Sequence, residues 1–215
     1  MTITPRRASV DLYQDELAAD LRRYLQEALE GGAAHAAVVP AADIPVDDRV
    51  VLKCRIPRCF GYGVSANCPP HAPTPAEMRR EIEGYEWAVL FSVDVEPPVI
   101  VRDKSTIVER IAAYQTVYDI VNSLESRAFY DGHYLAFGLG AGSCRHTFCS
   151  QATDCAAVKG ERCRFSLKSR PSLEAVGIDV YRMFARLGWE IYPAGSSMKA
   201  DDLPCGSLAG MVVVQ

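Results

Sequence analysis

Hydrophobic residues recur at helical spacing in four stretches of the chain. In the first stretch they repeat every three or four positions from Leu17 to Ala28, and a Gly-Gly pair follows Glu30. The second begins with Thr74-Pro75-Ala76-Glu77, a capping box with proline at the first helical position. The predicted helices are 11–30, 74–83, 104–126 with Asp103 as N-cap, and 172–187 with a bend at Gly177 and an end at Gly188.

Shorter apolar runs between turn residues predict strands. The longest covers 87–95 and ends at Pro97-Pro98. Together with the helix that follows and the run at 133–139, it gives the order strand, helix, strand that is typical of a right-handed crossover. We therefore predict an α/β fold with a mixed, mostly parallel sheet flanked by helices. The predicted strands are 34–39, 50–53, 87–95, 133–139, 189–192 and 208–214.

Length and composition indicate one globular domain. The chain has 215 residues, of which 49% are hydrophobic, and this is enough for a sizeable core. The net charge of -4 disfavours a general nucleic-acid binder or a protein held at a membrane surface by basic residues. No apolar segment of a secretory signal follows the first residues, and no stretch approaches the length of a membrane span. These features predict a cytoplasmic protein.

Seven of the eight cysteines fall into two groups. The first group is Cys54, Cys59 and Cys68, and the second is Cys144, Cys149, Cys155 and Cys163. Because disulfides are rare in a reducing compartment, clustered thiols there indicate metal ligands. Each group follows a predicted strand, so we expect two cysteine-rich loops at one edge of the sheet, where open α/β sheets bind their ligands.

Basic residues surround both groups although the whole protein is acidic. They are expected to lower the pKa values of the thiols and to offset the charge of a thiolate-ligated centre. The segment Gly138-Leu139-Gly140-Ala141-Gly142 differs from a dinucleotide-binding fingerprint, and we interpret it as room for a cluster. The candidates for a pocket beside the metal are Arg55, Arg58, Tyr62, His71 and Arg145.

Three interpretations of the thiols remain open. Iron–sulfur clusters take four thiolates, which the second group supplies, and Cys68-Pro69 resembles the cysteine–proline pair of ferredoxin-type sites. Structural zinc usually binds closely spaced cysteine pairs, and the chain has no C-x₂-C pair. Buried cysteines without a ligand would not gather among so many charges. The spacing therefore favours one or two iron–sulfur clusters, [4Fe-4S] by type, with zinc as the alternative.

Several segments around the cysteines resemble, in combination, an uncharacterised family of predicted metal-binding proteins. The segments are Lys53-Cys54-Arg55-Ile56-Pro57-Arg58-Cys59, Tyr62-Gly63, Cys68-Pro69-Pro70-His71-Ala72-Pro73-Thr74, Ala136 to Arg145, Cys163-Arg164 and Arg170 to Val180. The resemblance covers about residues 34 to 192 and implies that these cysteines bind an iron–sulfur cluster or another metal. It divides the single domain, 1–215, into an N-terminal helix (1–33) packed on a metal-binding core (34–192) and a C-terminal strand segment (193–215).

The two groups predict different roles. The four-cysteine group is expected to hold a cluster for electron transfer. The three-cysteine group has no obvious fourth ligand, although Cys205 is possible, and an open position is what separates catalytic from closed metal sites. We therefore expect a small substrate or ligand at the first group and a redox partner protein, with reductase or sulfur-transfer chemistry. The alternative is a zinc-stabilised binding module without redox activity.

Overall fold

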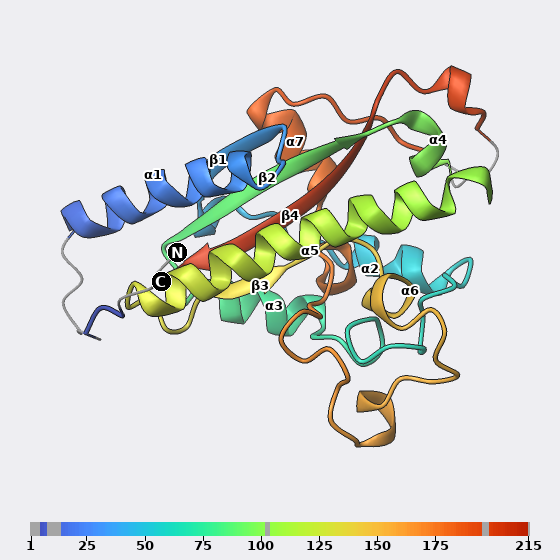
Figure 1. Cartoon of the computed structure of the whole chain (residues 1–215), viewed down its shortest axis with the longest axis horizontal. Coiled ribbons are helices and arrows are strands. Elements are labelled where there is room, and N and C mark those ends of the chain that lie inside the picture. The colour runs from blue at the N-terminus through green and yellow to red at the C-terminus, as the bar shows by residue number, and fades with distance from the viewer. Residues whose placement is uncertain (1–4, 8–13, 102–103, 195–197, 215) are drawn as a thin grey trace.

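The computed structural model describes residues 5–7, 14–101, 104–194 and 198–214. Within them, one sheet has the strand order β1-β2-β4-β3, and helices cover both of its faces (Figure 1). The strands are β1 (His35–Pro40), β2 (Trp87–Val95), β3 (Phe137–Leu139) and β4 (Gly206–Val214). The α-helices are α1 (Gln14–Glu30), α2 (Asp48–Arg55), α3 (Pro75–Ile82), α4 (Pro97–Ile100), α5 (Ile107–Tyr130), α6 (Cys144–Phe148) and α7 (Val180–Leu187).

Every pair of neighbouring strands in the sheet is antiparallel, so the prediction of a mostly parallel sheet is wrong. The crossover from β2 through α5 to β3 would pair two parallel strands if they were neighbours. Instead, β4 from the far end of the chain lies between them, and its Met211 pairs with Leu90 on one side and Leu139 on the other. Because β4 is buried along almost its whole length, it belongs in the centre of the sheet.

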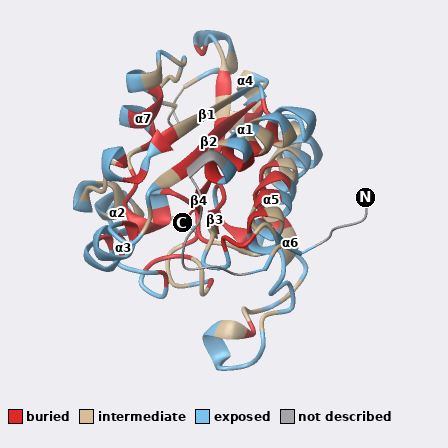
Figure 2. Cartoon of the chain, turned by 90° about the vertical axis from the view of Figure 1, so that its left-hand side faces the viewer, coloured by how far each residue is buried: buried red, intermediate tan, exposed pale blue. Residues whose placement is uncertain are grey.

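The sheet is the middle of three layers. Along β2, Leu90 faces a core built with α3 and α7, and its neighbours Val89 and Phe91 face a second core built with α1 and α5. This alternation follows from the two-residue period of a strand. Figure 2 shows the buried residues concentrated in β2, β4 and the sides of α1 and α5 that face the sheet. The body of the molecule therefore has a full apolar core on each side of its sheet.

A buried carboxylate ties α1 to the turn that follows α5. Asp20 accepts hydrogen bonds from Arg6 at 2.7 Å and from Arg23 at 2.7 Å. Its other contact is with His133 Nε2, at 3.0 Å, and His133 is also buried. His133, in the turn after α5, thus joins Asp20 of α1 in an internal polar network.

Several predicted elements have the expected position and type. Thr74 and Glu77 form the predicted capping box at the start of α3. Of the helix predicted over 172–187, only α7 is α-helical; the first half holds a 3-10 turn at Glu174–Val176 that ends at Gly177, with φ of 92°. The predicted end at Gly188, with φ of 70°, is confirmed. The N-cap of α5 is Thr106, and the predicted cap Asp103 lies outside the described residues.

Two predicted strands are wrong. Residues 50–53 belong to helix α2, because Asp47 caps it by accepting from the Arg49 N–H and because none of its side chains is buried as a strand in the sheet would be. Residues 189–192 are not a strand; Trp189 instead stacks on His35 with ring centroids 5.4 Å apart. The strand expected at 133–139 is only Phe137–Leu139. None of the helices within the described residues is long and apolar enough to span a membrane.

Candidate metal centre and its pocket

The two cysteine groups lie side by side, below one end of α5 in Figure 1, and hydrogen bonds join their loops. The Cys68 thiol of the first loop donates to Ser143 Oγ of the second at 3.3 Å. In return, Cys144 Sγ lies 3.2 Å from Ser65 Oγ and accepts from Asn67 Nδ2 at 3.4 Å. These reciprocal contacts place the two groups together, although the strand 50–53 expected to lead into the first one is a helix.

The first group surrounds one end of a cavity. Cys54 lies in the last turn of α2, and Cys59 and Cys68 follow in the loop after it. All three line the same cavity, whose volume is about 680 Å³. The Gly61 N–H donates to Cys59 Sγ at 3.5 Å, and a Cβ on Gly61 would lie 3.4 Å from Cys68 Sγ. The backbone at Gly61 therefore lies close to two of the sulfurs.

The second group occupies α6 and the long loop that follows it. Cys144 begins α6, Cys149 caps its carboxyl end, and Cys163 Sγ lies 3.3 Å from Ser169 Oγ. Burial disfavours the Cys155 thiolate, yet the pKa of Cys155 is lowered, since backbone N–H groups of both loops donate to its sulfur. The donors are Ala66 of the first loop and Val158 and Ala157 of the second. Such N–H groups stabilise a thiolate ligand.

Burial and mutual repulsion control most of the thiol pKa values. Burial raises the pKa of Cys54 to about 11, and the charges of Cys59 and Cys68 add to the shift. Burial also raises the pKa of Cys144, which the charges of Cys155 and Cys163 raise further. The prediction that basic residues lower the thiol pKa values is therefore wrong for these two. A bound metal cation would relieve both effects, since it deprotonates the thiols that coordinate it.

The basic residues act more on the second loop than on the first. At Cys149 burial is again the largest cause of a raised pKa, and the charges of Arg145 and Arg164 oppose it. Arg145 also donates to the carbonyl oxygens of Cys149 and Ala152, so it holds the loop as well as offsetting charge.

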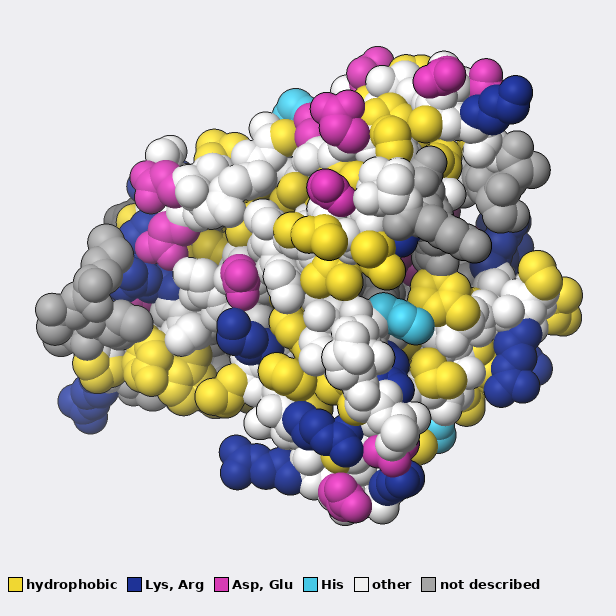
Figure 3. All heavy atoms as spheres, turned by 45° about the vertical axis from the view of Figure 1, so that its right-hand side comes forward, with side chains coloured by type: hydrophobic (Ala, Val, Ile, Leu, Met, Phe, Trp, Pro, Cys, Tyr) yellow, Lys and Arg dark blue, Asp and Glu magenta, His cyan; other side chains and the backbone are white. Residues whose placement is uncertain are grey.

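On the face drawn in Figure 3, acidic side chains lie mainly in the upper half and basic ones mainly in the lower half, with hydrophobic side chains between them.

The donor set fits a thiophilic metal, because every candidate ligand is a thiol and backbone N–H groups reach several of the sulfurs. Among the described residues, no group of three or more His, Cys, Asp or Glu side chains is already arranged around a single ion. The seven cysteines form two neighbouring groups, as the sequence predicted, and their role as ligands stays a prediction.

Cys205 stands apart from both groups. It lines the same cavity as Cys54, but it belongs to the segment that leads into β4. Burial raises the pKa of Cys205, and the charges of Glu190 and Asp94 raise it further.

The predicted pocket residues are scattered. Of the five, only Tyr62 lines the large cavity; Arg55 lines a separate hollow beside it. The Arg58 guanidinium lies over the Tyr62 ring, 5.5 Å from its centroid, and so contacts a residue of the cavity wall. His71 is exposed, and its backbone N–H donates to the Cys68 carbonyl oxygen. Arg145 supports the second loop, as described above.

The glycines at 138 and 140 make room for α5. A Cβ on Gly138 would lie 2.3 Å from Val121 Cγ1, and one on Gly140 would lie 2.6 Å from Tyr118 Cε1. These distances are far below van der Waals contact, so a side chain at either position would push α5 away from β3. Gly142, at the end of the segment, lines the cavity beside the first cysteine group. The interpretation of this segment as room for a cluster stays a prediction.

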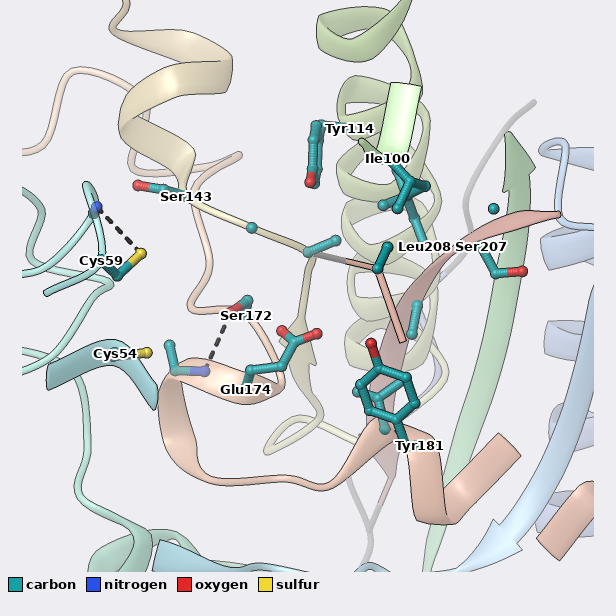
Figure 4. A pocket seen from close by; sticks show the side chains of 18 of the residues that line it. Cys54, Cys59, Ile100, Tyr114, Ser143, Ser172, Glu174, Tyr181, Ser207 and Leu208 are labelled. Atoms are coloured by element: carbon teal, nitrogen blue, oxygen red, sulfur yellow. Dashed lines mark hydrogen bonds between the residues drawn. The ribbon is translucent and has the colours of Figure 1, made fainter. Parts of the chain in front are cut away.

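Glu174 is the residue that sequence reasoning missed. Its carboxyl group points into the cavity (Figure 4), and none of the ion pairs among the described residues includes it. Among the described residues lining the cavity, it is the only one with an Asp, Glu, Lys or Arg side chain. The residue as a whole is exposed to solvent. The protein atoms around its carboxyl group nevertheless raise the pKa of that group, while its own backbone N–H and Ser172 oppose the shift. Its place in the segment 170–180, which carried the family resemblance, was the available signal.

Comparison with known proteins agrees with the cysteine-rich character of the site. A family model described as "Predicted metal-binding protein (DUF2284)" matches residues 37–208. No curated protein and no solved structure matches the chain.

Proposed function

The chain belongs to this family of predicted metal-binding proteins, and on that premise we propose that it binds two iron–sulfur clusters. The second group would hold one cluster with four thiolates. The first group would hold the other with Cys54, Cys59 and Cys68 and would leave one metal position open toward the cavity. The observation that carries the proposal is that these three cysteines line the cavity, whereas none of the four in the second group does.

Two features favour iron–sulfur over zinc. Backbone N–H groups donate to Cys155 and Cys59, and hydrogen bonds to sulfur are a recognised means of tuning the potential of a cluster. The spacings also lack the close cysteine pairs of structural zinc sites. The experiment below distinguishes iron–sulfur clusters from zinc.

The contacts between the loops support electron transfer between the two centres. Ser143 and Ser65 each bond to a cysteine of the opposite group, so the chain brings the two sets of thiols together without an intervening element. When bound, the clusters would supply one-electron redox chemistry. Reducing equivalents from a partner protein would enter at the four-cysteine centre, and the three-cysteine centre would serve a small molecule in the cavity.

The cavity favours an enzyme over a simple electron carrier. A volume of about 680 Å³ is within the range of small-molecule sites. The reaction class is then that of a reductase or of a sulfur-transferring enzyme that binds substrate sulfur at an open iron. Free thiols in this number also suit a reducing compartment, so we place the protein in the cytoplasm.

The test is anaerobic purification followed by analysis of iron, acid-labile sulfide and zinc, with a visible spectrum. We expect a brown protein with iron and sulfide in equal amounts and a broad visible absorption. Cys54→Ser and Cys144→Ser should each remove part of the iron, and together they should remove all of it. A colourless protein that carries zinc, or one whose iron is unchanged in both variants, would overturn the proposal.

A further inference from the structure

The cavity beside the first cysteine group has one charged side chain in an otherwise neutral wall. Among the described lining residues, Glu174 alone is acidic, and none is Lys or Arg. Most of the rest of the wall is apolar or aromatic. An anionic ligand would meet this carboxylate without a compensating cation, whereas a cationic ligand would meet a complementary charge.

Hydroxyl groups surround the same space. Figure 4 shows the Glu174 carboxyl group directed into the cavity, with the hydroxyl groups of Tyr114 from α5 and Tyr181 from α7 on either side of it. Burial raises the pKa of Tyr181, and the charge of Glu174 raises it further. Ser172 and Ser207 contribute two further hydroxyl groups to the wall. A carboxylate with hydroxyl oxygens around it is an acceptor set for a group that carries several N–H donors.

The wall of the cavity also contains apolar side chains. Ile100, Val180 and Leu208 are among those that line it. They offer a short hydrocarbon chain an apolar surface that removes its CH₂ groups from water. The combination of one carboxylate, several hydroxyl groups and an apolar wall is the arrangement by which pockets orient small amphiphilic molecules.

From these observations we propose that the cavity binds a small primary alkylammonium compound. Its ammonium group donates to the Glu174 carboxylate and to the tyrosine hydroxyl oxygens, and its alkyl chain packs against the apolar wall. A primary amine fits better than a quaternary one because hydroxyl oxygens accept N–H hydrogen bonds. The inference rests on the proposed function only in that this ligand would lie beside the open metal position. The ammonium group has no lone pair for a metal, so Glu174 and the hydroxyl groups would hold it.

The test uses n-butylammonium as the probe, with butan-1-ol as its neutral analogue and butyrate as its anionic one. Binding to the purified, iron-loaded protein is measured by calorimetry at about pH 8, where a primary amine is still protonated. We expect n-butylammonium to bind at least about tenfold more tightly than butan-1-ol, because hydrogen bonds to a charged group are stronger than neutral ones. Butyrate should bind more weakly than n-butylammonium. Equal affinity for n-butylammonium and butan-1-ol, or a preference for butyrate, would overturn the inference.

Variants assign the effect to Glu174. Glu174→Gln should weaken n-butylammonium binding about tenfold or more and leave butan-1-ol binding unchanged. Glu81→Gln, an exposed carboxylate on α3, is the matched control and should bind as the wild type does. Glu174→Asp keeps the charge, so it should bind more tightly than Glu174→Gln and serves if the glutamine variant does not fold. Unchanged binding in Glu174→Gln would overturn the proposal.

Iron content separates this inference from the proposed function. Glu174→Gln should keep the iron and the visible spectrum of the wild type, since no thiol is removed. If the protein carries iron–sulfur clusters but does not distinguish n-butylammonium from butan-1-ol, the inference fails and the proposed function stands. If it binds n-butylammonium through Glu174 but carries no iron, the proposed function fails and the cavity assignment stands.

Discussion

The sheet and the cysteine loops are held together by different forces. In β2 and β4 most residues are buried, and apolar side chains fill both faces of the sheet. Of residues 149–170, all of which the structure describes, only Ala156 is buried. The loop around Ala157–Lys159 projects from the body in Figure 1. Hydrophobic burial therefore stabilises the sheet. The loops need another source of stability, which metal binding would supply.

The two regions also differ in how the charge of their ionisable groups is compensated. Asp20 in the body has Arg6, Arg23 and His133 as partners, and its pKa is lowered although burial would raise it. The thiols of Cys54 and Cys144 have raised pKa values, since burial and the other thiols disfavour their charge. The body satisfies its buried charge with its own side chains. The loops concentrate anionic ligands that only an added cation would satisfy.

The largest effect is expected when a ligand is removed from the second group. Cys144→Ser, Cys149→Ser and Cys163→Ser should each lose the iron of that centre and expose residues 140–170, because metal-binding energy is folding energy in loops without a core. Cys155→Ser should act in the same direction. Hydrogen exchange should show faster amide exchange in this segment, with β2 and β4 unchanged. Wild-type iron content and unchanged exchange would show that the second group is not a ligand set.

The converse experiment weakens the body and leaves the loops intact. Leu90 is fully buried at the centre of β2, and Leu90→Ala should lower the free energy of unfolding by about 3 kcal/mol through lost burial and a cavity. Denaturant unfolding measures the change. Iron per folded molecule should stay at the wild-type level; a parallel loss of iron would mean that the two regions are not separately stabilised.

Asp20 offers a smaller and pH-dependent change in the body. Asp20→Asn should cost about 2 kcal/mol, because the buried site loses its charge but keeps hydrogen-bonding groups. The folded-state pKa of Asp20 is lowered, so its stabilisation is complete above the unfolded-state value of about 3.9 and is lost as the pH falls below it. Thermal melting from about pH 7 to about pH 3 should show a smaller loss of stability for Asp20→Asn than for the wild type. Parallel curves would contradict this.

Cys205→Ser should have the smallest effect. It tests whether the first group leaves one metal position open. Cys205 lines the cavity from the β4 side, and the charges that influence it are Glu190 and Asp94 rather than those of the first group. We expect unaltered iron content, spectrum and reduction potential in the variant. Added cyanide or thiol should change the spectrum of the wild type at the open position. Loss of one centre in Cys205→Ser, with a wild type that ignores added ligand, would make Cys205 the fourth ligand.

Local sequence signals predicted α1, α3, α5 and α7 as helices, but not α2, α4 or α6. The capping box at Thr74 and the glycines at 177 and 188 act within one or two turns of the chain, so they could be recognised without a fold. The run at 50–53 was predicted as a strand because its valines favour strands, whereas Asp47 caps a helix there. A short apolar run has no periodicity long enough to separate the two structures.

The sequence by itself determined the central strands, most helices, and the presence of two cysteine groups with the character of a metal site. Only the tertiary structure decided that β4 lies between β2 and β3, that the glycines at 138–142 admit α5, and that Glu174 faces a cavity beside Cys54. The first set depends on residue type and short spacing, which the chain carries locally. The second depends on which distant segments pack together, and burial of apolar surface selects that arrangement over the whole molecule at once.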